Sequence, residues 1–209
     1  SCEDEGEGYF QVKNFEIIMD QVEWADAVLI GPGLGTNKET IDLLTMIYEN
    51  INKPLVVDAD GLNPFYKNRD LLKKLQCVLT PHHGELSRLL SISLGELKEK
   101  LVNHMEGFAS SYPSVLIAKQ PSSIIVHNIS GYINTSGNPG LATAGTGDVL
   151  SGMVTAFIAQ GYNLVESSCI STYIHGYVAD KMSKKISERG LIASDLLLEI
   201  ASSMSRYES

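Results

Sequence analysis

The stretch AVLIGPGLGTNKETIDLLTMIYENINKPLVVDAD, residues 27–60, decides the fold class of this chain. It begins with AVLIG, a continuous apolar run that ends in glycine, as expected for a strand buried on both faces. Apolar residues then repeat at helical spacing from Ile41 to Ile51. After Pro54 a second apolar run, LVV, ends in the acidic triplet DAD. A strand, a helix and a second strand in this order predict a sheet of parallel strands with helices between them.

The rest of the chain continues this alternation. Further strands are predicted in CVLT (77–80), SVLIAK (114–119), SIIVH (123–127) and GYIN (131–134). Helices are predicted over Leu94–Phe108, 147–160, 164–186 and 194–204. The fold class is therefore α/β, with a mostly parallel sheet covered on both faces, and the strand order stays open. In such sheets ligands bind beyond the carboxyl ends of the strands, where this sequence keeps its glycines, its carboxylates and His82.

Composition narrows the class of protein. The 209 residues suffice for one sizeable core, and the formal net charge of −9 argues against binding to nucleic acid or an anionic membrane surface. No apolar run reaches the roughly 18–20 residues of a membrane helix. Three distant cysteines, Cys2, Cys77 and Cys169, predict neither disulfides nor a zinc site and fit a reducing, cytoplasmic compartment. We expect one domain, 1–209, with residues 1–13 as an acidic, flexible lead-in.

The segment NTSGNPGLATAGTGDVLSG, 134–152, carries the strongest functional signal. Its glycines let backbone amides approach a phosphate, and the apolar helix that follows points its N-terminus at the same place. Asp148 lies in the first turn of that helix. A carboxylate beside an anion site can act as the base of a phosphoryl transfer, or it can simply cap the helix. The segment matches neither a P-loop nor a dinucleotide-binding fingerprint.

Other loops that follow predicted strands have two readings each. GPGLG (31–35) is a tight turn or a place where backbone meets a ligand, and DADGLN (58–63) is an Asx turn or a functional pair of carboxylates. In TPHHGE, His82 and Glu85 have the spacing of a capping box or belong to a ligand site. Lys119 faces solvent or a nucleotide phosphate. His175 is interpreted as a buried structural histidine, and Cys77 and Cys169 as small core residues.

In this order GPGLG, VVDADGLN, LTPHHGE, the lysine before PSSII and the glycine-rich segment resemble the ADP/ATP-dependent NAD(P)H-hydrate dehydratases of the ribokinase-like superfamily. The resemblance runs from about Asp26 to Met204 and includes FIAQGYNLVESSCISTYIHGYVAD and GLIASDLLLEI. It implies a three-layer α/β/α fold. It also implies an enzyme that repairs hydrated NADH or NADPH (NADHX or NADPHX) with ADP or ATP as phosphate donor and Mg²⁺, and that assembles as a homo-oligomer.

The resemblance also implies roles for residues. Asp148 would be the catalytic base and would bind substrate together with Gly33 and His82, and Glu85 would help to organise Mg²⁺. The nucleotide would be bound by Lys119, Gln120, Pro121, Ser122, Ser123, Asn138, Pro139, Gly140, Leu141, Ala142, Thr143, Ala144, Gly145, Thr146 and Gly147.

The chain departs from the family pattern at three positions. Members usually carry glycine where this chain has Ala144 and Gln120, and proline where it has His83. Ala144 replaces glycine without strain only if its φ is negative. The resemblance further implies an αβ segment, with a glycine-rich loop for substrate, ahead of the acidic lead-in. We therefore expect the domain to be incomplete at its N-terminus in this chain.

Two other functions remain open from the sequence. The first is a small-molecule kinase of the same superfamily that acts on a vitamin-type alcohol. It would use the GTGD segment (145–148) in the same way but release a phosphorylated product. The second is a nucleotide-binding module without turnover. DADGLN and TPHHGE favour the dehydratase.

Overall fold

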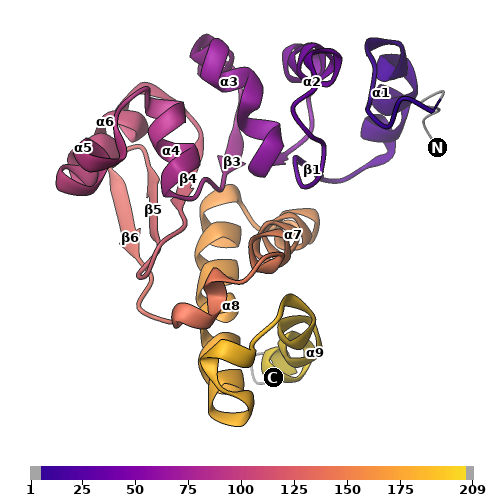
Figure 1. Cartoon of the computed structure of the whole chain (residues 1–209). Coiled ribbons are helices and arrows are strands. Elements are labelled where there is room, and N and C mark those ends of the chain that lie inside the picture. The colour runs from indigo at the N-terminus through magenta and orange to yellow at the C-terminus, as the bar shows by residue number, and fades with distance from the viewer. Residues whose placement is uncertain (1–5, 206–209) are drawn as a thin grey trace.

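The computed structural model describes residues 6–205, in which strands and helices alternate along most of the chain (Figure 1). The strands are β1 Val28–Ile30, β2 Leu55–Val57, β3 Cys77–Leu79, β4 Val115–Ala118, β5 Ile124–His127 and β6 Ser130–Ile133. The helices are α1 Phe15–Trp24, α2 Lys38–Asn50, α3 Asn63–Lys67, α4 His83–Leu90, α5 Leu94–Glu99, α6 Leu101–Ser111, α7 Thr146–Ala159, α8 Leu164–Ile186 and α9 Ala193–Met204. Short 3-10 helices include η1 Val12–Asn14, η2 Ala59–Leu62, η4 Pro139–Ala142 and η5 Glu188–Gly190.

The strands form a single six-stranded sheet whose order in space, β1-β2-β3-β4-β5-β6, is also their order in the chain. Strands β1 to β4 are parallel, β5 pairs antiparallel with β4, and β6 pairs antiparallel with β5. The loops after the four parallel strands therefore leave the sheet at one end. The predicted mostly parallel sheet is confirmed, and the structure supplies the strand order that the sequence left open.

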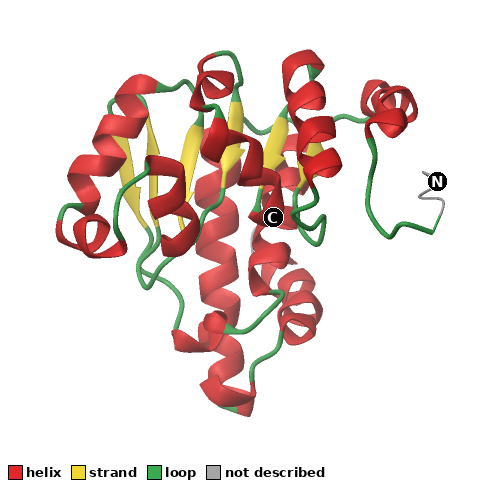
Figure 2. Cartoon of the chain, turned by 45° about the horizontal axis from the view of Figure 1, so that its top comes forward, coloured by secondary structure: helices red, strands yellow, loops and turns green. Residues whose placement is uncertain are grey.

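Helices cover both faces of the sheet (Figures 1 and 2). Helices α2 to α6 pack on one face, while α7 contacts β1 and β2 and α8 contacts β3, β4 and β5 on the other. Helix α9 packs against α7 and α8 from outside. The three-layer α/β/α arrangement is confirmed.

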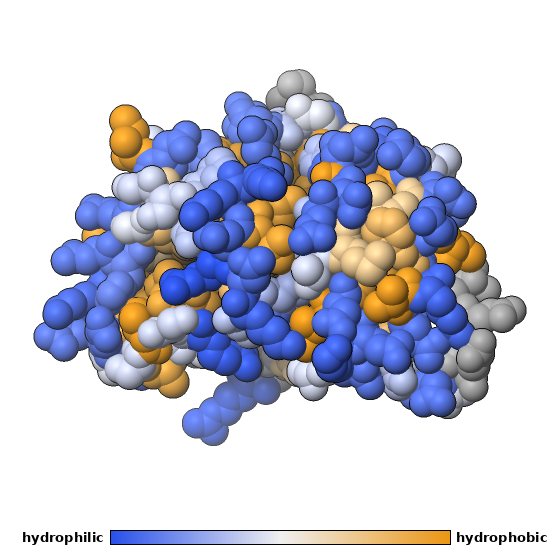
Figure 3. Space-filling model, turned by 90° about the horizontal axis from the view of Figure 1, so that it is seen from above, coloured by the Kyte–Doolittle hydropathy of each residue, from blue (hydrophilic) through white to orange (hydrophobic). Residues whose placement is uncertain are grey.

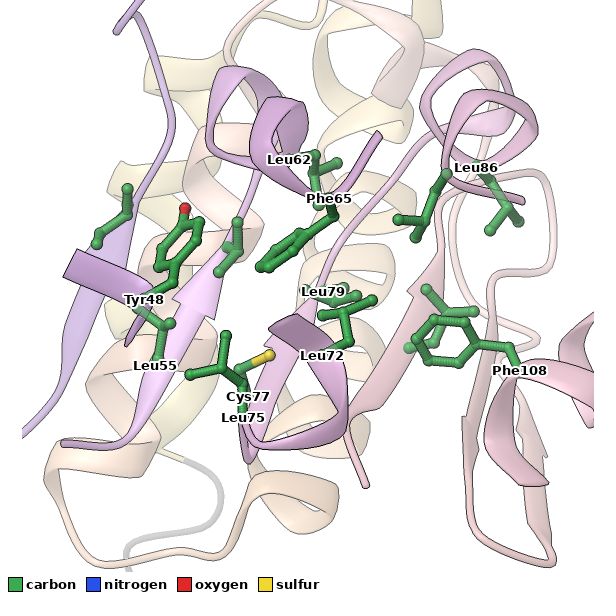
Figure 4. Close-up of a cluster of buried hydrophobic side chains, with 14 of the residues drawn as sticks. Tyr48, Leu55, Leu62, Phe65, Leu72, Leu75, Cys77, Leu79, Leu86 and Phe108 are labelled. Carbon is green, nitrogen blue, oxygen red and sulfur yellow. The ribbon is translucent and has the colours of Figure 1, made fainter. Parts of the chain in front are cut away.

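The central strands have continuous apolar runs because both of their faces are buried, each in a different core. In β2, Leu55 and Val57 join the core under α2 to α6, whereas Val56 joins the core under α7 and α8. Figure 4 shows the first of these cores, in which the rings of Tyr48 and Phe65 stack with centroids 4.9 Å apart. Such stacking adds about 0.5–1.5 kcal/mol to the burial of the rings.

The structure corrects two expectations about helices. Helix α1 was not predicted, although Phe15, Ile18, Met19 and Val22 repeat at helical spacing and the first three pack against the core under α2 to α6. The predicted helix over Leu94–Phe108 is two helices, since the backbone of Lys100 leaves the helical region at φ −126° and ψ 31°. Leu97 and Met105 are buried on either side of this break, so the apolar spacing persists while the helix does not.

The expected lead-in, 1–13, lies partly outside the described residues. Within the described part, Val12 and Lys13 belong to η1, and the carbonyl of Phe10 accepts a hydrogen bond from the Thr40 hydroxyl at 2.9 Å. This stretch is therefore tied to α2 before α1 begins. Cys2 also lies outside the described residues, and Cys77 is buried in the core, which raises the pKa of its thiol to about 12.

Strand β1 forms one edge of the sheet, and a cavity of about 610 Å³ runs along it. None of the residues that line this cavity is charged. The face seen in Figure 3 is mostly hydrophilic, with hydrophobic residues scattered over it. Among the described helices even α8, with 23 residues, is too polar to cross a membrane.

Candidate functional site

A cavity of about 820 Å³ opens at the carboxyl ends of the parallel strands. Segments after β2, β3 and β4 line it, together with the glycine-rich loop (residues 134–147), the first turn of α7 and part of α8. The predicted site residues meet here with two exceptions, Gly33 and Gly140. The convergence expected at this end of the sheet is therefore observed.

Asp148 lies in the first turn of α7 with its carboxylate exposed to the cavity. The residue that caps this helix is Gly145, so the alternative reading of Asp148 as the helix cap is wrong. The Asp148 carboxylate makes no hydrogen bond to any described residue. It is consequently available to accept a proton from a bound hydroxyl.

Lys119 and Asp58 form a buried ion pair beside this turn. The Lys119 Nζ lies 2.7 Å from Asp58 Oδ1, and the Asp58 side chain is 1% exposed. A Cβ on Gly147 would lie 3.1 Å from the same Nζ. Lys119 therefore places its charge against the first turn of α7 and does not face open solvent. Asp58, which the sequence left undecided between an Asx turn and a functional role, also accepts the Ala59 N–H at 2.9 Å.

His82 and Glu85 form the predicted capping box at the start of α4. The Nδ1 of His82 accepts the Gly84 N–H at 2.9 Å, and Glu85 Oε2 accepts the His82 N–H at 2.8 Å. The other Glu85 oxygen lies 3.3 Å from His82 Nε2. Because Nδ1 accepts, Nε2 carries the proton and can donate to a ligand. Both residues line the cavity, so the capping and ligand readings are compatible.

The turn 119–123 closes another side of the cavity. The ring Nε2 of His83 lies 2.7 Å from Gln120 Oε1, and the Ser123 hydroxyl donates to the Gln120 carbonyl. His83 and Gln120 are two of the three positions that depart from the family pattern, and here they bond to each other. Ala144, the third, is not among the described residues with positive φ, so it replaces glycine without backbone strain.

The loop GPGLG does not reach this cavity. Gly31 is needed for contact between two loops, because a Cβ there would lie 1.6 Å from the Asp58 carbonyl oxygen. The Gly35 N–H donates to Asp60 Oδ2 at 2.8 Å and ties the loop to η2. These contacts support the structural reading of GPGLG, and Gly33 is not among the residues that line the cavity.

Gly140 and Asn138 of the glycine-rich loop make their contacts within the protein. A Cβ on Gly140 would lie 2.8 Å from the Glu188 carbonyl oxygen, which explains why Gly140 does not line the cavity. The side chain of Asn138 is used within the protein, since its Oδ1 accepts the Gly140 N–H at 3.0 Å and begins η4. The loop is thus held by its own contacts before any ligand binds.

Sequence reasoning missed three residues that line the cavity from α8, namely Thr172, His175 and Gly176. His175 is 6% exposed, as its structural reading predicts, but its Nε2 also lies 2.9 Å from the Thr146 carbonyl oxygen. Burial, with a smaller contribution from the Lys119 charge, lowers the pKa of His175 to about 4, so the ring is neutral near pH 7. No local motif marks these residues, because they belong to a regular helix.

Among the described residues no group of three or more His, Cys, Asp or Glu could hold a metal ion. Three carboxylates nevertheless line the cavity, those of Asp58, Glu85 and Asp148. Magnesium in proteins commonly binds through one or two carboxylates, water and the phosphates of a substrate. The donor set fits such a cation better than one held by protein ligands alone.

A family model described as NAD(P)H-hydrate dehydratase matches residues 7–202. The bifunctional NAD(P)H-hydrate repair enzyme Nnr of Dictyoglomus turgidum is 36% identical over 197 residues, which cover 91% of this chain and 38% of that protein. The ADP-dependent (S)-NAD(P)H-hydrate dehydratase of Neisseria meningitidis is 31% identical over 178 residues, which cover 82% of this chain and 60% of that protein. The chain spans about a third of the length of the bifunctional relatives.

Solved structures share the fold. A ribokinase-like superfamily protein from Enterococcus faecalis superposes with a TM-score of 0.82 at 26% identity, over 94% of this chain and 68% of that one. The ADP/ATP-dependent NAD(P)H-hydrate dehydratase from Bacillus subtilis, co-crystallized with ATP/Mg²⁺, gives a TM-score of 0.76 at 24% identity, over 87% of this chain and 65% of that one.

Proposed function

Because this chain belongs to the NAD(P)H-hydrate dehydratase family, we propose that it restores NADH or NADPH from their hydrates with ADP or ATP as phosphate donor. The substrate is a small molecule that carries a hydroxyl on its reduced nicotinamide ring. Hydroxide is a poor leaving group, so the hydroxyl is first converted to a phosphate ester. The activity is that of a lyase, since a C–O bond breaks and a double bond forms.

One observation carries this proposal: the Asp148 carboxylate lies at the N-terminus of α7 inside the cavity and makes no hydrogen bond to residues 6–205. Asp148 accepts the hydroxyl proton while the hydroxyl oxygen attacks the terminal phosphorus of the donor. The donor then leaves as AMP from ADP or as ADP from ATP. Backbone amides at the helix N-terminus stabilise the negative charge of the transferring group.

The second half of the reaction needs little from the protein. The lone pair of the ring nitrogen expels the phosphate from the neighbouring carbon, and a proton leaves the next carbon to restore the ring double bond. Lys119 compensates phosphate charge from its position against the first turn of α7. Asp58 holds that ammonium in place at 2.7 Å.

The remaining site residues are assigned to the phosphate donor, to the hydrated nucleotide or to Mg²⁺. The turn 119–123 and the glycine-rich loop bind the donor, and His82 donates through Nε2 to the hydrated nucleotide. Gly33 lies outside this cavity, so its proposed contact with substrate needs a ligand that extends beyond it. When bound, Mg²⁺ would neutralise phosphate charge, with Glu85 as the carboxylate that helps to hold it.

We further propose that the protein works in the cytoplasm and as a homo-oligomer. The uncharged cavity along β1 supports the second point, because Trp24 borders it with 87% of its surface exposed and a second copy would cover this apolar area. Equilibrium sedimentation tests it: a molar mass equal to that of one chain at micromolar concentration contradicts a homo-oligomer.

The decisive experiment is regeneration of NADH from NADH hydrate by this chain, with Mg²⁺ and either ADP or ATP. NADH that forms only with a nucleotide supports the dehydratase and identifies the donor. Accumulation of a phosphorylated alcohol from another substrate, without NADH, favours the kinase. Nucleotide binding with no product of either kind favours the binding module.

A further inference from the structure

Helix α8 lies directly beneath the glycine-rich loop. Gly176 is the point of closest approach: a Cβ there would lie 2.6 Å from the backbone carbonyl carbon and oxygen of Ser136. The Ser136 hydroxyl also donates to the carbonyl oxygen of Tyr173, at 2.9 Å. The loop therefore begins in direct contact with the middle of this helix.

Asp180 holds the first part of the loop with both carboxylate oxygens. Its Oδ2 accepts the Gly137 N–H at 2.8 Å, and its Oδ1 accepts the Asn138 side-chain amide at 3.0 Å. Asn138 in turn accepts the Gly140 N–H through its own oxygen. Two hydrogen bonds thus connect α8 to the loop, and a third, between Gly140 and Asn138, carries the connection on to η4. A carboxylate suits this position because it accepts from two donors and presents none.

His175 holds the other end of the loop. Its Nε2 lies 2.9 Å from the Thr146 carbonyl oxygen, and since a carbonyl can only accept, that nitrogen carries the proton. The Thr146 hydroxyl donates to the carbonyl oxygens of Leu141 at 2.6 Å and Thr143 at 2.8 Å. The bond from His175 therefore fixes both the first turn of α7 and the loop that precedes it.

We infer that α8 fixes the geometry of the donor site, with Asp180 and His175 as positioning residues at the two ends of the glycine-rich loop. Asp180 does not line the cavity, so it acts through Gly137 and Asn138. Amides bind a phosphate strongly only when their directions are set beforehand, because ordering them on binding costs free energy. The inference rests on the proposed function in taking this loop as the site of the phosphate donor.

The test compares Asp180→Asn with the unchanged chain. In Asp180→Asn one carboxylate oxygen becomes an NH2 group, so either the Gly137 N–H or the Asn138 side-chain amide then faces a donor in place of its acceptor. Amide hydrogen exchange in the nucleotide-free protein should then speed up by about tenfold at Gly140 and Leu141. The dissociation constants of ADP and ATP with Mg²⁺ should rise by about tenfold, the effect of losing about one to two hydrogen bonds.

Glu166→Gln is the matched control on the same helix. Glu166 accepts one backbone N–H, that of Asn163, and a glutamine oxygen can replace it. This variant should leave loop exchange and nucleotide binding unchanged. The exchange of partners in Asn138→Asp/Asp180→Asn restores an acceptor for each donor, so it should return loop exchange to the original rate. A purely electrostatic role of the Asp180 charge would not give this rescue.

The outcomes separate the inference from the proposed function. Unchanged exchange and unchanged nucleotide binding in Asp180→Asn would overturn the inference, whatever the dehydratase assay shows. Faster exchange that the double variant rescues would support the hold of α8 on the loop. If the unchanged chain then bound neither ADP nor ATP, the proposed function and the donor part of the inference would both be overturned.

For His175, His175→Leu should loosen the turn at Thr146, and His175→Gln, whose amide can donate, should retain it.

Discussion

At the scale of single residues, the proposed chemistry depends on Asp148. Gly145 caps α7, so the carboxylate of Asp148 has no structural duty in the described part of the chain. Asp148→Asn keeps the size of the side chain and removes the base. We expect NADH regeneration to fall by about 100-fold or more, while the dissociation constant of the nucleotide changes little. Near-normal turnover in this variant would contradict the assignment.

The Lys119–Asp58 pair predicts an effect on stability. Lys119→Met leaves the Asp58 carboxylate buried, with the Ala59 N–H as its remaining hydrogen-bond partner in the described part of the chain. We expect the free energy of unfolding to drop by about 3–5 kcal/mol, the usual effect of removing one partner of a buried pair. The double variant Asp58→Asn/Lys119→Met also removes the unpaired Asp58 charge. Its free energy of unfolding should therefore drop by less than that of Lys119→Met.

Urea denaturation measures both variants of this pair. Lys38→Met is the matched control, because Lys38 pairs with Asp42 on the surface, where its side chain is 82% exposed. That substitution should change the free energy of unfolding far less than Lys119→Met. An equal drop in the free energy of unfolding for Lys119→Met and Lys38→Met would show that the buried pair stabilises the protein no more than the surface pair does.

At the scale of elements, the contact between α8 and the glycine-rich loop depends on a missing side chain. Gly176→Ala would put a Cβ 2.6 Å from the Ser136 backbone, so the loop must move. We expect weaker ADP and ATP binding and a lower melting temperature. Gly152→Ala in α7 is the control, because apart from its own turn of helix no described residue comes within 4 Å of its Cβ position. It should stabilise the protein by up to about 1 kcal/mol through helix propensity. A melting temperature raised in both variants would contradict the close contact.

The bond between α8 and α7 predicts a dependence on pH. Burial lowers the pKa of His175 to about 4 from 6.5, so the folded protein binds this proton only at a lower pH than the unfolded chain does. Its contribution to stability is complete above pH 6.5 and is lost as the pH falls from 6.5 through about 4. The loss amounts to about 3 kcal/mol. Urea denaturation across this interval should show a shallower decline for His175→Gln, and identical slopes would contradict the prediction.

At the scale of the whole molecule, the sheet connects the two cores and the cavity. Strands β2 and β3 send alternate side chains into the core under α2 to α6 and the core under α7 and α8, while their carboxyl ends line the cavity. A ligand in the cavity therefore touches elements from both layers. It should stabilise the protein as one unit and not one layer alone.

Thermal unfolding tests this coupling. With Mg²⁺ and nucleotide at about 100 times the dissociation constant, the folded state gains about 2.7 kcal/mol. For a chain of this length the midpoint should rise by about 5–10 °C in a single transition. A shift in one of two separate transitions would show that the layers unfold independently.

The sequence by itself determined the class of fold and pointed to most of the residues that line the candidate cavity. Apolar runs such as LVV and CVL predict strands, because strands buried on both faces need no alternation of apolar and polar residues. The helical spacing from Ile41 to Ile51 predicts a helix. Both patterns lie within a short stretch of sequence. The glycine-rich segment and Asp148 were found because their signal is also local. Parallel strands then bring the loops that follow them to one end of the sheet.

Only the tertiary structure decided the order of the strands, the break at Lys100 and the partners of the site residues. Asp58 meets Lys119 across 61 residues, and Asp180 meets Gly137 across 43. A regular helix gives no local sign of what one of its side chains will touch, because that depends on which elements pack beside it. For the same reason the sequence reading of Asp148 as base or cap stayed open until the structure showed Gly145 at the cap.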